Sequence, residues 1–208
     1  MHDILQNNKD IMSNIKTFYA HEKSIIEDLD KINDQYFMLE SKNKKTEIVV
    51  PIFLLLTTHK SFIACITLLQ SLQLSSCYTL TRSILESSAY AYYIDHDKKR
   101  KNIYISRNLN KERENDTKKE FTIKKICKYI RGNNIELCNK FEKLYNEAID
   151  KGAHPNIENI RPYFTVNEKF EYKYDFFETR EEIIVHTSSH IIEVGYFSIK
   201  MFKEILDA

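Results

Sequence analysis

The sequence predicts an all-α protein, folded as one antiparallel helical bundle of about six to seven helices. Gly and Pro each occur only three times in 208 residues, and these two residues mark most tight turns and strand ends. Apolar residues instead recur at helical spacing along most of the chain. Residues 61–94 contain only two charged side chains, Arg82 and Glu86, as expected of a buried helical hairpin. The length fits a single domain over residues 1–208.

Residues 1–40 are predicted to form one long helix. Its apolar positions repeat every seven residues and include Ile4, Ile11, Phe18, Ile25, Ile32 and Leu39. A heptad stripe without Gly or Pro is typical of a bundle helix or a coiled coil. We expect this helix to pack against the core hairpin or against a second copy of the chain, and on that basis we predict a homodimer.

Residues 47–95 are predicted to form the core helical hairpin, with its turn at residues 74–76. Arg82 and Glu86 lie four residues apart on the second helix, so they share one face and can pair. We favour a buried ion pair that fixes helix register, whose disruption strongly destabilises the fold. The alternative is a pocket that binds a small anion. His154, in a turn bounded by Gly and Pro, completes this candidate pocket, because its ordinary pKa suits acid–base work.

Residues 98–131 are strongly basic. They hold thirteen Lys and Arg against four Asp and Glu, a local net charge of +9, whereas the whole chain carries +1. This asymmetry predicts RNA or another anionic partner, and the alternative is a solvated helical face without a partner. We expect an exposed loop near residues 108–117 and a short amphipathic helix over residues 122–130. The candidate nucleic-acid contacts on this helix are Lys124, Lys125, Lys128 and Arg131.

The rest of the chain is predicted to form a helix over residues 135–151, a small irregular or β-hairpin insertion near 160–177 and a helix over 179–207. On the last helix, His186 and His190 have the i, i+4 spacing of two metal ligands. Two histidines alone make a weak site and a third ligand would have to come from elsewhere, with His154 and Glu193 as candidates, so we expect no metal. The absence of a nucleotide- or dinucleotide-binding motif likewise predicts no cofactor.

The cysteines and the apolar segments bear on localisation. Cys65, Cys77, Cys127 and Cys138 lie in apolar helical patterns without a C-x-x-C motif, and we predict reduced, buried thiols. No secretory pattern opens the sequence, and its apolar runs are short or interrupted by polar residues. We therefore expect a cytoplasmic protein that does not enter a membrane.

Arg180 and His186 have the spacing R-x5-H, which resembles the R-x(4–6)-H pattern of HEPN-domain ribonucleases. In those enzymes the pair acts on the scissile phosphate, since arginine stabilises charge on a phosphoryl oxygen and histidine moves a proton. The resemblance implies a metal-independent endoribonuclease with Arg180 and His186 as catalytic residues.

A second resemblance covers about half of the chain. The segment LTRSILESSAY, the later pair Leu144-Tyr145 and the tetrapeptide AHPN resemble a group of uncharacterised prokaryotic all-helical proteins. Those proteins carry an R-S-x-x-E helix followed by a Y…H-P-(S/N) element. The resemblance implies an all-α bundle and marks Arg82, Glu86 and His154 as positions of interest, and it implies no known activity.

The sequence leaves three hypotheses for function. We favour a non-catalytic interaction or regulatory module, because heptad patterns are clear and strong catalytic motifs are absent. The second hypothesis is an RNA-directed, HEPN-like ribonuclease of a toxin or phage-defence system. The third is the binding of a small anion or metabolite in a bundle pocket that includes Arg82, Glu86 and His154.

Overall fold

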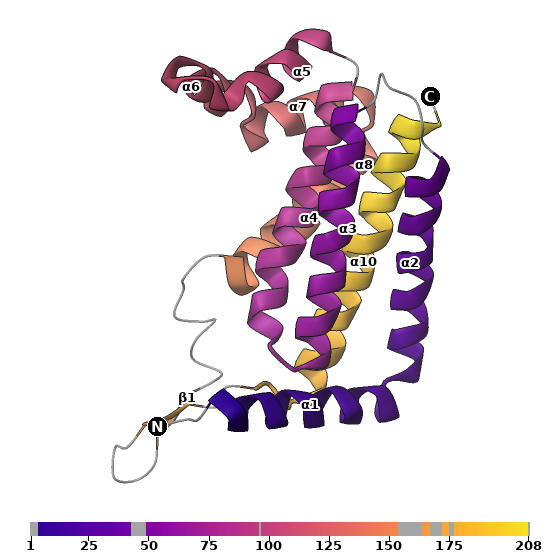
Figure 1. The fold of residues 1–208 in the computed structure, drawn as a ribbon, viewed down its shortest axis with the longest axis vertical. Helices are drawn as coiled ribbons and strands as arrows, with labels where there is room; N and C mark the ends of the chain where they lie inside the picture. Colours follow the sequence, from indigo (N-terminus) through magenta and orange to yellow (C-terminus); the bar gives the residue numbers. More distant parts are fainter. Residues whose placement is uncertain are drawn as a thin grey trace.

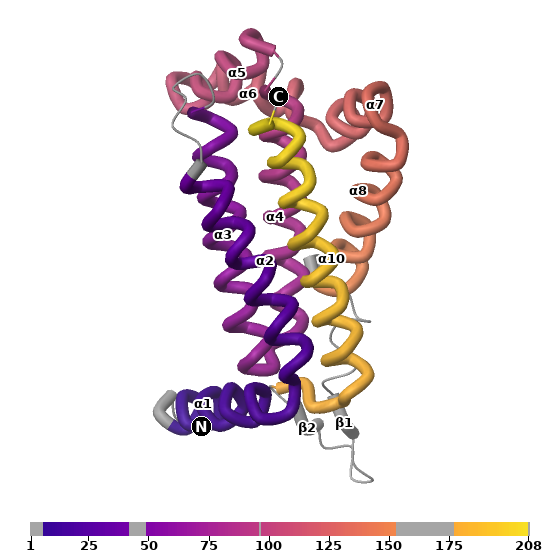
Figure 2. The backbone as a smooth tube through the Cα atoms, turned by 90° about the vertical axis from the view of Figure 1, so that its right-hand side faces the viewer, coloured from indigo at the N-terminus to yellow at the C-terminus, as the bar shows by residue number. Residues whose placement is uncertain are grey.

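The computed structural model describes residues 4–42, 49–95, 97–153, 164–166, 172–174 and 177–207. This part of the chain is helical apart from two short strands, which confirms the all-α class. Four long helices lie side by side along the molecule (Figures 1 and 2). They are α2 (Lys23–Lys42), α3 (Val49–Gln70), α4 (Leu74–Asp95) and α10 (Glu181–Leu206).

The core lies where α3 and α4 meet α2 and α10. Large side chains from all four helices are fully or almost fully buried there, including Tyr36, Phe62, Leu69, Ile84, Leu85 and Phe202. Helix α10 approaches its neighbours closely at Gly195. A Cβ atom at this position would lie 2.8 Å from Ile32 of α2 and 3.0 Å from Phe62 of α3, distances that only glycine accommodates without displacement of a neighbour.

The turn between α3 and α4 occupies residues 71–73, three residues before the predicted position. Leu72 has a φ of 61°, the left-handed conformation that commonly ends a helix. The N–H of Gln73 donates to the carbonyl of Leu68 at 2.9 Å, and that of Leu72 to Leu69 at 2.9 Å. Because a leucine rather than a glycine takes this conformation, the usual signal for a helix end is missing from the sequence.

The prediction of one helix over residues 1–40 is wrong, because the chain turns at Glu22. Helix α1 (Ile4–His21) crosses the end of the bundle, whereas α2 runs along it (Figures 1 and 2). No Gly or Pro marks the break. Instead, α1 is held across the α3–α4 turn, where the side chain of Asn14 donates to the carbonyl of Ser71 at 3.4 Å. The heptad residues of α2 pack inward against α3 and α10.

The predicted loop near residues 108–117 is largely helical. The basic segment forms α5 (Lys98–Ile105), the 3₁₀ turn η2 (Ser106–Asn108), α6 (Lys111–Glu120) and α7 (Ile123–Asn133). Asn110 caps α6 by accepting from the N–H of Arg113 at 2.9 Å. Charged pairs one helical turn apart stabilise the helix further, since Glu114 contacts Lys111 at 2.9 Å and Lys118 at 2.5 Å.

These additional helices correct the predicted number. The described residues contain nine α-helices rather than six or seven, because the first helix is divided and the basic segment is helical almost throughout. Helices α5, α6 and α7 gather at the end of the bundle opposite α1 (Figures 1 and 2). Arg100 holds α5 in place there, with its guanidinium carbon 3.8 Å from the ring centre of Tyr93 and 4.4 Å from that of Tyr129.

Helix α8 (Ile135–Ala148) runs back along α4 and continues into the π-helical turn η3 (Ile149–Ala153). Asn134 caps α8 by accepting from the N–H of Leu137 at 2.9 Å. Strand β1 (Phe164–Val166) pairs antiparallel with β2 (Tyr172–Tyr174). Most of the predicted insertion near 160–177 lies outside the described residues, so its overall form stays a prediction.

One of the described helices, α3, is long and apolar enough to cross a membrane by length and composition. A helix in the core of a bundle meets the same criterion, and α3 packs against α2, α4 and α10. The expectation of a cytoplasmic protein outside the membrane therefore stays a prediction.

Candidate functional site

Arg82 and Glu86 form the predicted pair, and Tyr145 from α8 joins them. The Arg82 Nε donates to Glu86 Oε1 at 2.9 Å, and the Tyr145 hydroxyl donates to the same oxygen at 2.8 Å. The guanidinium carbon of Arg82 lies 5.6 Å from the Tyr145 ring centre. The side chains of Arg82 and Glu86 are 30% and 27% exposed, so the pair lies at the α4–α8 surface rather than in the core.

Tyr145 belongs to the residues of the second resemblance, and the contact of its hydroxyl with Glu86 was not predicted. Burial raises the pKa of Tyr145 to about 12, and the hydrogen bond to the Glu86 carboxylate adds to the shift. The phenol is therefore a neutral hydrogen-bond donor at physiological pH. The structure also unites two parts of the second resemblance, the R-S-x-x-E helix and the downstream tyrosine, whereas His154 lies outside the described residues.

A pocket of about 560 Å³ opens between α7 and α8, within the usual range for small-molecule sites. Its lining consists of Ile123, Lys124, Cys127, Lys128, Arg131, Phe141, Glu142, Tyr145 and Asn146. Three of the four predicted nucleic-acid contacts thus line one pocket, since positions i, i+4 and i+7 share a helix face. The fourth, Lys125, instead pairs with Glu120 at 2.9 Å.

The charges around the pocket are positive in sum. Arg131 donates to Glu142 Oε2 at 2.5 Å, so these two opposite charges largely compensate each other. Lys124 and Lys128 line the same pocket and are exposed. The pocket therefore combines two lysine charges with apolar walls from Ile123 and Phe141.

A second, larger pocket of about 820 Å³ lies between α5 and α6. Three basic side chains and two acidic ones line it, so its charges are closer to balance: Lys99, Arg113, Lys119, Asp116 and Glu120. Arg113 is also paired with Asp116 at 3.7 Å. None of the residues predicted to form a site lines this pocket, and we regard it as the weaker candidate.

His186 and His190 both face Glu147 of α8. The His186 Nε2 lies 2.9 Å from Glu147 Oε1, and the His190 Nδ1 lies 3.4 Å from Oε2. On its other side, His190 Nε2 lies 3.1 Å from the hydroxyl of Thr81. Burial lowers the pKa of His190 despite the nearby carboxylate.

This order of hydroxyl, imidazole and carboxylate resembles a catalytic relay. Thr81, however, is fully buried, with 0% of its surface exposed, so no substrate reaches its hydroxyl. Its hydroxyl also donates to the Tyr78 carbonyl at 3.0 Å within α4. The chain of polar contacts thus joins α4, α8 and α10.

In the described part of the chain, Arg180 and His186 each contact a different carboxylate. Arg180 precedes α10, and its Nε donates to the buried carboxylate of Glu178 at 2.8 Å. Arg180 has extended backbone and does not belong to α10, so helical periodicity does not place its side chain relative to that of His186. His186 contacts Glu147 instead. The R-x5-H spacing alone carries no information about a shared helix face.

All four cysteines are free and buried, as predicted. No protein-family model, curated protein or solved structure matches this chain. The resemblances to the prokaryotic helical group and to HEPN ribonucleases therefore stay predictions, and the geometry described above carries the proposal of function.

Proposed function

We propose that the protein is a non-catalytic binding module that takes a small phosphorylated ligand in the α7–α8 pocket. The observation that carries this proposal is the position of Tyr145. Its ring lines the same pocket as Lys124 and Lys128, and its hydroxyl is fixed on Glu86. The proposal combines the regulatory-module hypothesis with the small-anion hypothesis. In it, the basic residues of α7 that line the pocket bind one small ligand rather than RNA.

The pocket matches a nucleotide-sized ligand in chemistry as well as in volume. Lysine ammonium groups bind phosphate as point charges, and Lys124 and Lys128 lie one helical turn apart at the pocket. Ile123 is partly exposed and offers apolar surface for a base or another flat group, whereas Phe141 is fully buried at the base of the lining.

Binding without catalysis is favoured by the groups that line the pocket. No histidine is among its described lining residues, and burial raises the pKa of Cys127 to about 12, which keeps that thiol protonated. We favour this function over the RNA-directed ribonuclease, because Arg180 is paired with Glu178 and His186 with Glu147.

A matched pair of charge reversals tests the proposal. Lys128→Glu changes a pocket residue, whereas Lys125→Glu makes the same charge change on the same helix outside the pocket. Binding of pyrophosphate and of ATP is measured by isothermal titration calorimetry. We expect Lys128→Glu to weaken binding at least about tenfold, equivalent to about 1.4 kcal/mol, and Lys125→Glu to change it less than about twofold.

Equal losses in the two variants would contradict a pocket and indicate a diffuse basic surface. The same titration with a short single-stranded RNA separates the remaining hypothesis. RNA binding that both variants weaken alike, without binding of pyrophosphate or ATP, would overturn the proposal in favour of an RNA-directed protein.

A further inference from the structure

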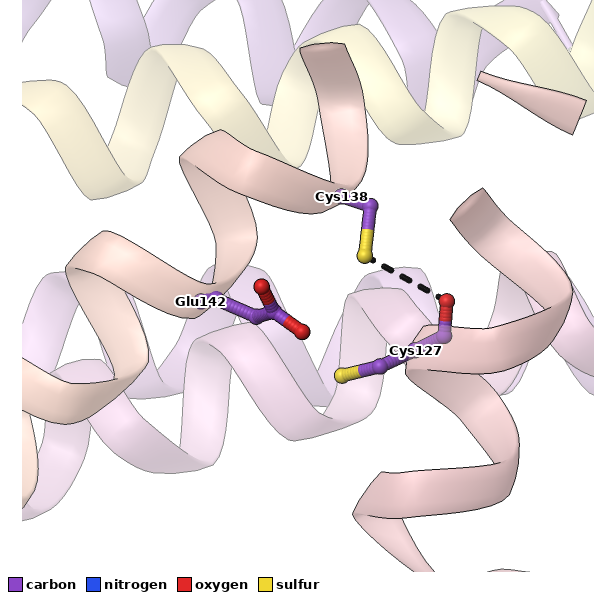
Figure 3. A group of neighbouring side chains, drawn as sticks. All are labelled: Cys127, Cys138 and Glu142. Carbon is purple, nitrogen blue, oxygen red and sulfur yellow. Dashed lines mark hydrogen bonds between the residues drawn. The ribbon is translucent and has the colours of Figure 1, made fainter. Parts of the chain in front are cut away.

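Two thiols and a carboxylate converge between α7 and α8. The Sγ atoms of Cys127 and Cys138 and a carboxylate oxygen of Glu142 all lie within 4.8 Å of one another. Figure 3 shows the three side chains directed into a common space between the two helices. No other group of three such ligating side chains occurs within the described part of the chain.

The helical hairpin explains this convergence. Cys138 and Glu142 are one turn apart on α8, so they share a face. Cys127 lies on α7, which packs against α8 across the short connection at Asn134. The Cys138 thiol donates to the Cys127 carbonyl at 3.3 Å.

The donor set and its dimensions suit Zn²⁺. Thiolate and carboxylate are both common zinc ligands, and zinc–sulfur bonds of about 2.3 Å at tetrahedral angles place two sulfurs roughly 3.8 Å apart. Ligand atoms already within 4.8 Å of one another need approach by no more than about 1 Å, a distance that side-chain rotation covers. Arg131 donates to Oε2 of Glu142, and a carboxylate has a second oxygen that can bind a metal.

The charges of the surroundings fit such a site. Two thiolates, one carboxylate and one Zn²⁺ sum to a charge of about −1. Arg131 lies beside Glu142, and Lys124 and Lys128 line the adjoining pocket. These basic side chains stabilise a net negative assembly, so they do not oppose occupation by the cation.

We propose that Cys127, Cys138 and Glu142 bind Zn²⁺ in a site whose fourth position opens into the α7–α8 pocket. Cys127 and Glu142 both line that pocket, so water or a pocket ligand supplies the fourth bond, as in open zinc sites. Binding replaces the two thiol protons, which pass to solvent, and breaks the Cys138 hydrogen bond. The proposal goes beyond anion binding and does not depend on it.

The second cysteine pair provides a matched control. Cys65 and Cys77 are buried between α3 and α4, each with its sulfur near the carbonyl of the other, at 3.6 and 3.7 Å. No carboxylate or imidazole completes a set of three ligands around them among the described residues. A Cys65→Ala/Cys77→Ala variant thus removes two buried thiols without removing the proposed site.

The test is titration of the reduced full-length protein with Co²⁺, an optical substitute for Zn²⁺, followed by competition with Zn²⁺. We expect a thiolate-to-cobalt charge-transfer band in the wild type and in Cys65→Ala/Cys77→Ala, and its loss in Cys127→Ala and Cys138→Ala. Glu142→Gln should weaken metal binding at least about tenfold, because even residues that only support a ligand contribute that much. This variant keeps the test decisive should a cysteine variant fail to fold.

Absence of the band in reduced wild-type protein would overturn the zinc site, as would its equal loss in the Cys65/Cys77 control. The zinc site would also be overturned if reduced and refolded protein formed a Cys127–Cys138 disulfide again instead of binding the metal. Pyrophosphate binding is measured separately in EDTA, where Cys138→Ala should bind as the wild type does. The two proposals therefore fail or succeed independently.

Discussion

At Glu86, one carboxylate oxygen accepts hydrogen bonds from both Arg82 and Tyr145. The first bond was predictable, because residues four apart on a helix are neighbours. The second joins residues 59 apart in the sequence, and no spacing rule connects them. The same holds for Glu147, which faces two histidines of α10 from α8. Local pairs follow from sequence periodicity, and pairs between helices follow only from how the helices pack.

The partial exposure of Arg82 and Glu86 lowers the stability that we ascribe to them. Exposed ion pairs contribute less to stability than buried ones. The strong destabilisation predicted for loss of a buried ion pair therefore does not apply to Arg82 and Glu86. Tyr145→Phe should cost about 1 kcal/mol in the free energy of unfolding, the typical net value of one hydrogen bond. Urea denaturation measures it. Tyr196→Phe, at an exposed site on α10, should remain within about 0.5 kcal/mol of wild type, and an equal loss there would contradict the prediction.

His190 should make the stability of the protein depend on pH. Burial lowers its pKa in the folded state, while Glu147 and Glu193 oppose that shift and His186 adds to it. The unfolded chain therefore takes up a proton near the ordinary pKa of about 6.5, before the folded protein does. The contribution of neutral His190 to the free energy of unfolding is fully present above that pH. It falls as the pH drops from about 6.5 towards the folded-state pKa.

The measurement is urea denaturation at pH 7.5 and 5.5. We expect the free energy of unfolding to fall by up to about 1.4 kcal/mol per pH unit below a pH of about 6.5. His190→Gln should flatten the dependence, and His186→Gln should retain it because His190 is still present. An unchanged slope in His190→Gln would show that another group carries the dependence.

At the scale of the elements, apolar periodicity located the long helices but not where they end. Helix α1 ends before Glu22 and α3 ends before Leu72, and neither site has the Gly or Pro that marks a break. The heptad repeat continues through Glu22, although α1 and α2 pack against different parts of the bundle. Helix α6 was missed for the opposite reason, because it is polar all round and its support comes from a cap and charged pairs.

Glycine at 152 lets η3 pack against the start of α4, and alanine should not fit there. A Cβ atom at this position would lie 2.4 Å from the Ser75 carbonyl oxygen, a backbone atom that cannot turn aside. We expect Gly152→Ala to destabilise the fold by about 1–3 kcal/mol, as overpacking does.

Gly132 is the matched control. It lies within α7, and a Cβ atom added there would have no neighbouring atom within 4 Å. Alanine should therefore stabilise the protein by up to about 1 kcal/mol through its higher helix propensity. Thermal unfolding of both variants checks the pair. The prediction fails if the two substitutions shift the midpoint in the same direction.

At the scale of the whole molecule, the all-α class was predictable because it depends on composition and periodicity, which every segment carries. The α7–α8 pocket was not. Lys124 and Lys128 were identified as exposed cations, but their common site with Tyr145 exists only because α7 and α8 fold back on each other. The zinc ligands were missed for the same reason, since Cys127 and Cys138 have no metal-binding spacing in the sequence.

The predicted homodimer rested on the heptad stripe of residues 1–40, and the fold uses most of that stripe internally. Phe18 of α1 and Leu29, Ile32, Tyr36 and Leu39 of α2 are each at most 5% exposed, so they are not available to a second chain. We therefore expect a truncated protein that lacks residues 1–21 to have the same oligomeric state as the full chain. Light scattering coupled to size-exclusion chromatography measures both. A dimer that becomes a monomer on truncation would show that α1 forms the interface, whereas an unchanged state places any interface on other surfaces of the bundle.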